Sequence, residues 1–228
     1  MTIAIAVCLQ DGALLIADGR QTNPMTPNGK VISDDINKIT HISTSISSIV
    51  FGITKATNMA LSTIRPNIIN EARSPVEILQ EIKRSVECGW NYLQTTLKQD
   101  VNRQHRAMRA GLLVGGYLPI QKQGGFIGGV LRRPNGHDAP TLETKQCSLI
   151  VLGGEENNSQ EIFKQAFNQE KRTQNDPLKA LLRAGVATIR QVEQVNPWVG
   201  GVIRYLILRR GFSCSEGILS GEKYGQEN

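Results

Sequence analysis

The chain starts with two apolar runs, TIAIAVCL and ALLIADGR, which are separated only by the residues QDG. An Asp-Gly connection between two runs rich in β-branched residues predicts a β-hairpin. Chain ends are usually loose, because ordering a terminus costs entropy and gains few contacts. A first strand that starts at Thr2 therefore commits the N-terminus to the core, and we expect its position to matter.

Strands and helices are expected in blocks along the rest of the chain. The expected strands are 36–42 and 45–53, then 109–118, 124–133 and 145–154, and finally 200–210 and 212–219. The expected helices are 56–72, which Pro66 interrupts, a long one after the Ser74–Glu77 capping box, one capped by Ser159, and one started by Asp176-Pro177. The long helix carries an apolar stripe: Val76, Leu79, Ile82, Val86, Trp90, Leu93, Leu97 and Val101.

The block order favours an antiparallel, layered α+β domain over a fold with singly alternating strands and helices. No stretch between the blocks has the composition of a linker. We therefore expect residues 1–228 to form a single domain, with a polar, frayed tail from about residue 219.

Composition argues against several classes of protein. The net charge of +6 comes from scattered Lys and Arg, so we expect no nucleic-acid partner. No apolar stretch reaches the ~18–20 residues that span a bilayer, and the N-terminus lacks the basic start of a signal peptide, so we expect no membrane partner and a cytoplasmic location.

Four cysteines without a CxxC pair predict reduced thiols and no metal site. The chain has no GxGxxG, GxxxxGK[ST], GxSxG or HExxH motif, and we expect no cofactor.

The start of the chain also offers a nucleophile. Removal of Met1, which a small second residue permits, would give Thr2 both a hydroxyl and a free α-amine with a reference pKa of ~7.7–8.0. Such a site needs a cation to lower these pKa values and a carboxylate to hold the cation. Lys38 and Asp18, each in an expected strand, suit these roles. The same spacing also allows a structural ion pair, and the residues alone leave both interpretations open.

The opening stretch resembles the proteasome β-type subunits and their bacterial homologues. In that family a processed threonine is followed by an apolar strand, a DG turn and a second strand that ends in AD-x-R-x-T. The matching residues here are Thr2, Asp11-Gly12, Ala17-Asp18, Arg20 and Thr22. The family's K-[IL]-x-x-I pattern is reproduced by residues 38–42, and VFGITKA places Gly52 at the family's distance after the lysine. The element order agrees over nearly the whole chain, although most of the specificity lies in the N-terminal quarter.

The resemblance implies a four-layer αββα sandwich of two antiparallel sheets flanked by helices, the fold of the N-terminal-nucleophile hydrolases, and a threonine endopeptidase. By this resemblance Thr2 is the nucleophile, Lys38 a positive charge that favours its alkoxide, and Asp18 the group that orients Lys38. The Gly52 N–H would donate to the oxyanion. The resemblance also implies four substrate-binding residues: Gln21, Thr22, Val50 and Thr54.

The match has departures. Where the family has Asp and Ser before the last Gly-Gly pair, this chain has Asn196 and Val199. A family serine near Gly154 is replaced by Glu155, and Ser159 or Glu155 are candidates to substitute for it. Two alternatives therefore stay open: a subunit that assembles as a scaffold without cleaving, and an amidase or transpeptidase of the same superfamily.

The resemblance also implies the partners. We expect a peptide or unfolded protein as substrate and assembly into a homo-oligomeric ring or stacked rings. We expect no propeptide before Thr2, in which case activation would need only the removal of Met1. The sequence does not indicate ring size or an unfoldase partner.

Overall fold

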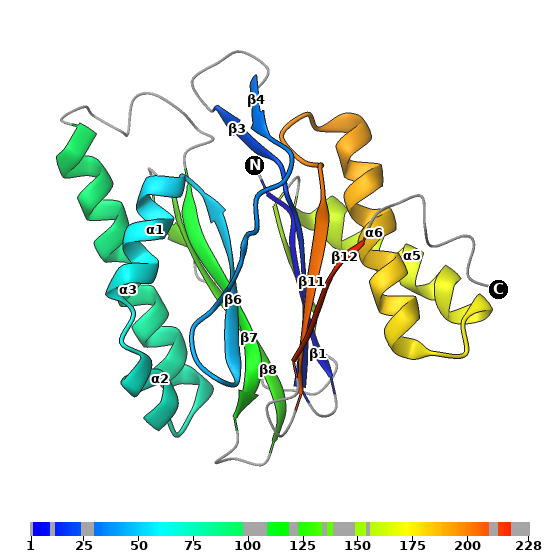
Figure 1. Ribbon diagram of the computed structural model, residues 1–228, viewed down its shortest axis with the longest axis horizontal. Helices are drawn as coiled ribbons and strands as arrows, with labels where there is room; N and C mark the ends of the chain where they lie inside the picture. Colours follow the sequence, from blue (N-terminus) through cyan, green and yellow to red (C-terminus); the bar gives the residue numbers. More distant parts are fainter. Residues whose placement is uncertain are drawn as a thin grey trace.

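The computed structural model describes residues 2–9, 12–23, 30–97, 109–118, 123–133, 136–138, 149–153, 156–209 and 214–219. Within these residues the chain forms two five-stranded antiparallel sheets and a separate two-stranded hairpin. The two large sheets lie face to face and helices cover their outer faces, which gives four layers (Figure 1). The expected α+β class with layered antiparallel sheets is therefore confirmed.

The first large sheet contains the N-terminal hairpin. Its strand order is β10-β1-β2-β11-β12, with β1 Ala4–Leu9, β2 Gly12–Asp18, β10 Leu149–Leu152, β11 Ile203–Arg209 and β12 Cys214–Leu219. β1 pairs with β2 from Ala4↔Ala17 to Leu9↔Gly12, as the two apolar runs predict. Gly12 is the first residue of β2, while Gln10 and Asp11 lie outside the described residues. Because β1 has β10 on its other side, the first strand of the chain is enclosed within the sheet.

The second large sheet has the order β5-β6-β7-β8-β9. Its strands are β5 Ile39–His41, β6 Ile46–Gly52, β7 Ala110–Leu118, β8 Gln123–Arg133 and β9 Gly136–Asp138. The first four confirm expected strands. The sequence did not predict β9 or the hairpin of β3 (Gln21–Asn23) and β4 (Lys30–Ser33). These strands are only three or four residues long, which is too short for a period-2 pattern to stand out.

Helices fall into two groups on opposite sides of the sheets (Figure 1). One group is α1 (Thr54–Thr63), α2 (Pro66–Glu71) and α3 (Pro75–Leu97), and the other is α5 (Glu156–Thr173) and α6 (Pro177–Val195). Pro66 separates α1 from α2, and Asp176 caps α6 by accepting from the N–H groups of Leu178 and Lys179, both as expected. Among the described residues no helix is both long and apolar enough to cross a membrane.

Two helix predictions were wrong. Ser159 does not cap α5, which starts at Glu156; its hydroxyl instead donates to the carbonyl oxygen of Gly153 at 3.2 Å. Val76 is not part of the buried stripe of α3, since 53% of it is exposed. Ile78 takes its place, because the core-facing residues of α3 follow the order Ile78, Ile82, Val86, Trp90 and Leu93. The stripe residues Leu97 and Val101 lie where side chains are not described.

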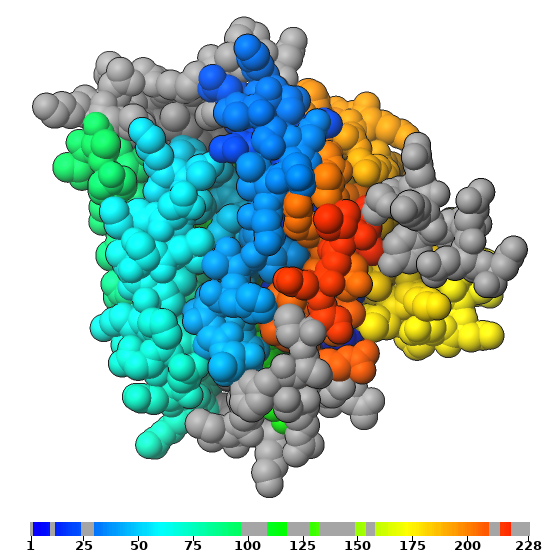
Figure 2. All heavy atoms as spheres, viewed as in Figure 1, coloured from blue at the N-terminus to red at the C-terminus, as the bar shows by residue number. Residues whose placement is uncertain are grey.

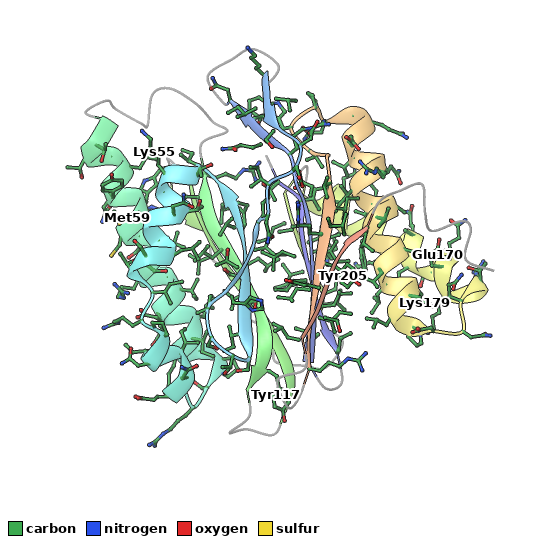
Figure 3. All side chains as sticks on the ribbon, in the orientation of Figure 1. Lys55, Met59, Tyr117, Glu170, Lys179 and Tyr205 are labelled. Carbon is green, nitrogen blue, oxygen red and sulfur yellow. The ribbon has the colours of Figure 1, made fainter. Side chains whose placement is uncertain are left out.

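Side chains fill the space between the two large sheets and the spaces between each sheet and its helices (Figure 3). In β1, Ile5 and Val7 face α5 and α6, whereas Ala4, Ala6 and Cys8 face the other sheet. The small residues between the sheets permit a close approach: a Cβ on Gly115 of β7 would collide with the Leu15 side chain of β2. The period-2 pattern of the opening runs thus decides which layer each side chain enters.

An ion cluster holds the α1–α2 connection to α3. The Glu81 carboxylate of α3 is 3% exposed and accepts from the guanidinium groups of Arg65 and Arg84 and from the Arg65 backbone N–H at 3.0 Å. Arg84 also donates to the carbonyl oxygen of Thr63, the last residue of α1. Burial by itself raises the pKa of Glu81, but these hydrogen bonds outweigh it and lower the pKa to about 2.

We expect the Glu81→Gln variant to lose about 1–3 kcal/mol of unfolding free energy at pH 7, because two guanidinium groups lose their carboxylate. A carboxylate whose pKa is lowered on folding stabilises at pH values above its unfolded value, here 4.5, and that contribution is lost as pH falls toward about 2. The difference between wild type and variant should therefore shrink from pH 7 to pH 3 in urea titrations. Glu87→Gln on the same helix is the control, and a difference that does not depend on pH would contradict the assignment.

Candidate active site

Lys38 Nζ lies at the centre of a cluster of oxygen atoms. It is 2.9 Å from Thr2 Oγ1, 3.1 Å from Asp18 Oδ1 and 2.7 Å from the carbonyl oxygen of Arg20. An ammonium group has three N–H donors, and each of these oxygens can accept one of them. The structure thus brings together the three residues that the sequence predicts as nucleophile, cation and carboxylate.

The Asp18 carboxylate at the end of β2 accepts hydrogen bonds at both of its oxygens. Besides Lys38, Oδ1 accepts from the Ile3 N–H at 2.9 Å, and Oδ2 accepts from the N–H groups of Gly200 at 3.2 Å and Arg20 at 3.3 Å. Hydrogen bonds to a carboxylate are stronger than those between neutral groups, and several of them fix its orientation. Asp18 therefore ties Ile3, the residue next to Thr2, to both Lys38 and a turn late in the chain.

All three side chains are withdrawn from water. Thr2 is 7% exposed, Asp18 1% and Lys38 6%. Burial raises the pKa of Asp18, against the opposing effect of Lys38, and burial lowers the pKa of Lys38, against the opposing effect of Asp18. The positive charge of Arg20 lowers the pKa of Lys38 further. The site therefore favours a lysine that can change its protonation state more easily than one at the surface.

Lys38 reaches the first sheet from the second. Its backbone belongs to the approach to β5, where its carbonyl oxygen accepts from the Val50 N–H of β6 at 2.8 Å. The preceding residues are held to the first sheet, since the Ile36 N–H donates to the Gly19 carbonyl at 2.9 Å. In the space-filling view this part of the chain runs as a band between α1 on one side and β11 and β12 on the other (Figure 2). The site thus lies between the two sheets, at the end where β3 and β4 project (Figure 1).

Gly153 is a residue of the site that sequence analysis did not single out. It follows β10, and its φ of +101° lies in the left-handed region that favours glycine. A Cβ at this position would collide with the backbone carbonyl oxygen of Thr2. Ser159 of α5 supports the same residue through its hydrogen bond to the Gly153 carbonyl. The Gly-Gly pair 153–154 is the signal that the sequence offers, since such pairs mark a bulge or a close backbone approach.

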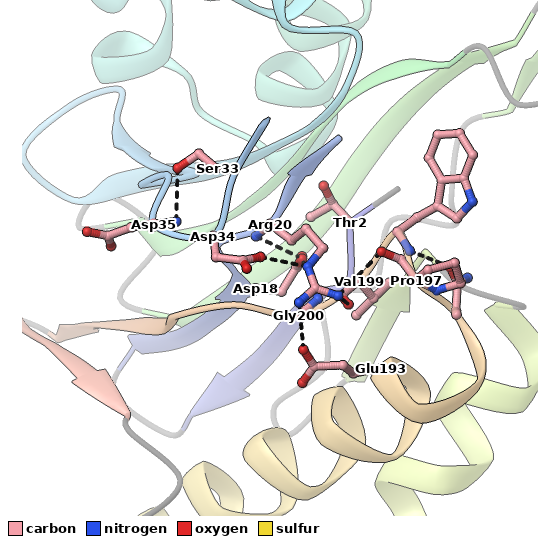
Figure 4. A network of polar contacts seen from close by, with 12 residues as sticks. Thr2, Asp18, Arg20, Ser33, Asp34, Asp35, Glu193, Pro197, Val199 and Gly200 are labelled. Carbon is pink, nitrogen blue, oxygen red and sulfur yellow. Dashed lines mark hydrogen bonds and ion pairs between the residues drawn. The ribbon is translucent and has the colours of Figure 1, made fainter. Parts of the chain in front are cut away.

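A second group of charges lies beside the site (Figure 4). The Arg20 guanidinium donates from Nε to Asp34 Oδ1 at 2.6 Å, from Nη2 to Glu193 Oε1 at 3.0 Å, and from Nη1 to the carbonyl oxygens of Val199 at 2.9 Å and Pro197 at 3.3 Å. Arg20 was part of the sequence pattern but had no expected role. Asp34 and Glu193 gave no sequence signal, because their contacts depend on folding of distant segments.

The turn that follows α6 carries the two departures from the family pattern. Asn196 is the C-cap of α6, and its Oδ1 accepts from the Trp198 N–H at 3.0 Å. Val199 is fully buried. Their side chains are thus engaged within the turn and the core, while the backbone of the turn reaches the site through the Gly200 N–H and Asp18.

The residues expected to bind substrate lie around this cluster. Gln21 and Thr22 are half-buried on β3, and Gln21 Nε2 donates to Thr54 Oγ1, the first residue of α1, at 3.1 Å. Val50 is half-buried on β6 and packs with the apolar cluster under α1 and α3. Gly52 is exposed at the end of β6 with φ +90°, and a Cβ there would collide with the Arg109 carbonyl oxygen. Its expected contact with an oxyanion belongs to the proposal below.

Within the described ranges, no group of three or more His, Cys, Asp or Glu side chains could hold a metal ion. Glu155 and Ser159 were the candidates to replace the family serine. Glu155 lies outside the described residues, and the Ser159 hydroxyl donates to the Gly153 carbonyl oxygen.

We expect Lys38→Met to lower the unfolding free energy by about 3–5 kcal/mol at pH 8, because it leaves the Asp18 carboxylate buried without its cation. The loss should be smaller at pH 5. A carboxyl whose pKa is raised on folding binds its proton more readily when folded, so lowering the pH stabilises the folded variant. Urea unfolding at both pH values measures this.

The control for that measurement is Lys164→Met, which removes a lysine from an exposed ion pair with Glu161. Exposed pairs contribute about 0–1 kcal/mol, so this change should be small at both pH values. Equal losses in the two variants would show that the Lys38–Asp18 pair is not a buried, coupled pair.

A further prediction concerns the close approach of Gly153 to Thr2. A side chain in a left-handed conformation costs about 1–3 kcal/mol, and backbone atoms must also move to make room for it. We therefore expect Gly153→Ala to lower the unfolding free energy by that amount or more. Gly217→Ala is the matched control, since the three atoms nearest to a Cβ there all belong to the side chain of Tyr205 rather than to backbone. Thermal unfolding measures both, and a smaller loss for Gly153→Ala than for Gly217→Ala would contradict the contact.

Comparisons with known proteins do not identify a family for this chain. No family model matches the sequence, and no curated protein matches it. A function must therefore be argued from the described residues of the site and from the resemblance in the sequence.

Proposed function

We propose that this chain is a threonine endopeptidase in which Thr2, exposed by removal of Met1, is the nucleophile. The observation that supports it most is the 2.9 Å contact between Lys38 Nζ and Thr2 Oγ1 inside a buried site. Lysine in such a position serves a threonine hydroxyl in two ways: as a cation it stabilises the alkoxide, and as a neutral amine it accepts the hydroxyl proton.

The hydrogen bonds of Lys38 are compatible with both protonation states. The Asp18 carboxylate and the Arg20 carbonyl can only accept, so the lysine must donate to each of them. The remaining position on Nζ faces the Thr2 hydroxyl, which can both donate and accept. The ammonium donates to Oγ1, whereas the neutral amine turns its lone pair toward the hydroxyl proton. A lowered pKa of Lys38 makes the second state easier to reach.

The proposed reaction has two steps. Thr2 Oγ attacks the peptide carbonyl, its proton passes to Lys38 or to the freed α-amine, and the C–N bond breaks as the departing amine takes that proton. Water then attacks the ester on Thr2 and releases the carboxylic acid. The Gly52 N–H is the proposed oxyanion donor, and losing one such donor typically costs about 10²–10³ in rate.

Substrate binding is proposed along β3. An extended peptide can add to Gln21 and Thr22 as a further strand, with backbone hydrogen bonds giving affinity and a side-chain pocket giving preference. Val50 and Thr54 are the proposed lining of that pocket. Val50 packs in an apolar cluster, so we propose a moderately apolar preference.

The resemblance in the sequence also leads us to propose a fold family, an assembly and a class of substrate for this chain. Four layers of helices and antiparallel sheets are compatible with the N-terminal-nucleophile hydrolase fold, which we propose for this chain. We also propose that it assembles into a homo-oligomeric ring or stacked rings in the cytoplasm, and that its substrates are peptides or unfolded proteins.

One observation favours a second candidate, an inactive assembly subunit. Asn196 and Val199 stand where the family has an acidic residue and a serine, and both are occupied within the turn and the core. Neither can hold the α-amine of Thr2 electrostatically. An intact Lys38 cluster favours the peptidase instead, because a scaffold has no chemical need for a buried lysine beside Thr2.

The test is the intact mass of the purified protein with and without a peptide epoxyketone, which bonds to both the amine and the hydroxyl of an N-terminal threonine. We expect loss of Met1 and one adduct in the wild type and in Thr2→Ser, and no adduct in Thr2→Ala. Retained Met1 with no adduct would contradict the proposal and favour the scaffold. An adduct that also forms with Thr2→Ala would place the nucleophile elsewhere.

A further inference from the structure

Arg20 connects three parts of the chain that are far apart in sequence. Its side chain is 16% exposed. The guanidinium contacts Asp34 in the segment that leads to Lys38, Glu193 on α6, and the carbonyl oxygens of Pro197 and Val199 in the turn after α6. A guanidinium presents its donors in a rigid planar fork, so these contacts fix the relative positions of the segments as well as attracting them.

The backbone of the same residue touches the site itself. The Arg20 N–H donates to Asp18 Oδ2 at 3.3 Å, and its carbonyl oxygen accepts from Lys38 Nζ at 2.7 Å. A displacement of the Arg20 backbone would therefore move two groups at once: the carbonyl oxygen that accepts from Lys38 and the N–H that donates to Asp18.

The turn after α6 requires such support. Gly200 and Gly201 have φ values of +137° and +76°, conformations that glycine adopts far more readily than residues with a side chain. A Cβ on Gly200 would collide with Glu193 Oε1 and come within 2.9 Å of Arg20 Cζ, so the Arg20–Glu193 pair lies directly against the backbone of the turn. The Gly200 N–H that donates to Asp18 is thus positioned by this packing.

The segment before Lys38 is held in the same way. Asp34 binds Arg20 through its side chain, and its carbonyl oxygen accepts from the Val202 N–H at 2.7 Å. Lys38 follows four residues later, and its ammonium must reach across to the first sheet. Because Asp34 is held by these hydrogen bonds, the backbone that leads from it to Lys38 is less free to shift.

We propose that Arg20 is a positioning residue of the active site, whose guanidinium holds the 34–38 segment and the 197–200 turn so that Lys38 Nζ and the Gly200 N–H meet Asp18 beside Thr2. The inference rests on the proposed function. Arg20 does not touch the reacting atoms through its side chain; it acts through Lys38 and Asp18. Its charge has a second effect: burial does most to lower the pKa of Lys38, Asp18 opposes this, and the positive charge of Arg20 lowers that pKa further.

The test compares Arg20→Gln and Arg20→Lys with the wild type. Arg190→Gln is the matched control, because Arg190 donates to the other carboxylate oxygen of Glu193, Oε2, and has no contact with the turn carbonyls that Arg20 binds. Two readouts are used: the rate and the concentration dependence of epoxyketone addition at Thr2, and the titration of Lys38 followed by NMR of ¹³Cε-labelled lysine, assigned with Lys38→Met.

We expect Arg20→Gln to slow addition by about 10²-fold at saturating reagent, the scale of a 1 Å misplacement, with the half-saturating concentration changed by less than about twofold. The Lys38 pKa should rise, because a neighbouring cation is lost. Arg20→Lys should slow addition while leaving the Lys38 pKa closer to that of the wild type, since it keeps the charge but loses the fork. Arg190→Gln should resemble the wild type in both readouts.

The two proposals fail separately. If the wild type forms no adduct, the peptidase proposal fails, and the Lys38 titration still decides the role of Arg20. A wild-type addition rate and an unmoved Lys38 titration in folded Arg20→Gln would overturn the positioning role. If Arg20→Gln does not fold, Asp34→Asn and Glu193→Gln each remove one arm: slower addition with unchanged half-saturation supports the role, and wild-type behaviour of both overturns it.

Discussion

Lys38 and Asp18 form an ion pair that is buried between the two large sheets. Taking two charges out of water costs several kcal/mol for each ion, and the pair is tolerated only when the remaining donors and acceptors are satisfied. Here the lysine has three oxygens and the carboxylate has three backbone N–H groups besides the lysine. A lysine ammonium exposed at the surface would interact far more weakly with the Thr2 hydroxyl, because water screens its charge.

That interaction explains why distant segments converge at one end of the sandwich. β2 supplies Asp18, the approach to β5 supplies Lys38, and the turn after α6 supplies the Gly200 N–H. Thr2 is held from two sides, by the contact of its carbonyl with Gly153 and by the hydrogen bond of Ile3 to Asp18. The enclosed first strand thus holds the residue next to the N-terminus in a fixed relation to the lysine.

Sequence patterns predicted the parts of this arrangement that are local. The hairpin of β1 and β2, the Pro66 break and the Asp176 cap follow from turn chemistry, capping and periodicity within a few residues. Thr2, Asp18 and Lys38 could be named from the sequence because an N-terminal nucleophile needs a cation and a carboxylate, and because the opening stretch resembles a known family pattern. Gly153, Asp34 and Glu193 could not be predicted, since their roles arise from contacts between segments far apart in the sequence. Ser159 misled because a serine before a helix suits a cap, whereas here the helix starts earlier and the hydroxyl bonds to Gly153.

We propose that the Thr2 oxygen becomes covalently acylated during turnover. An acid quench of the protein in the presence of a reactive peptide ester, followed by fragmentation mass spectrometry of the N-terminal peptide, tests this directly. We expect an acyl group on an N-terminal Thr2, which is absent from Thr2→Ala and reduced in Lys38→Met. An acyl group on another residue, or none on a protein that nevertheless turns the ester over, would contradict it.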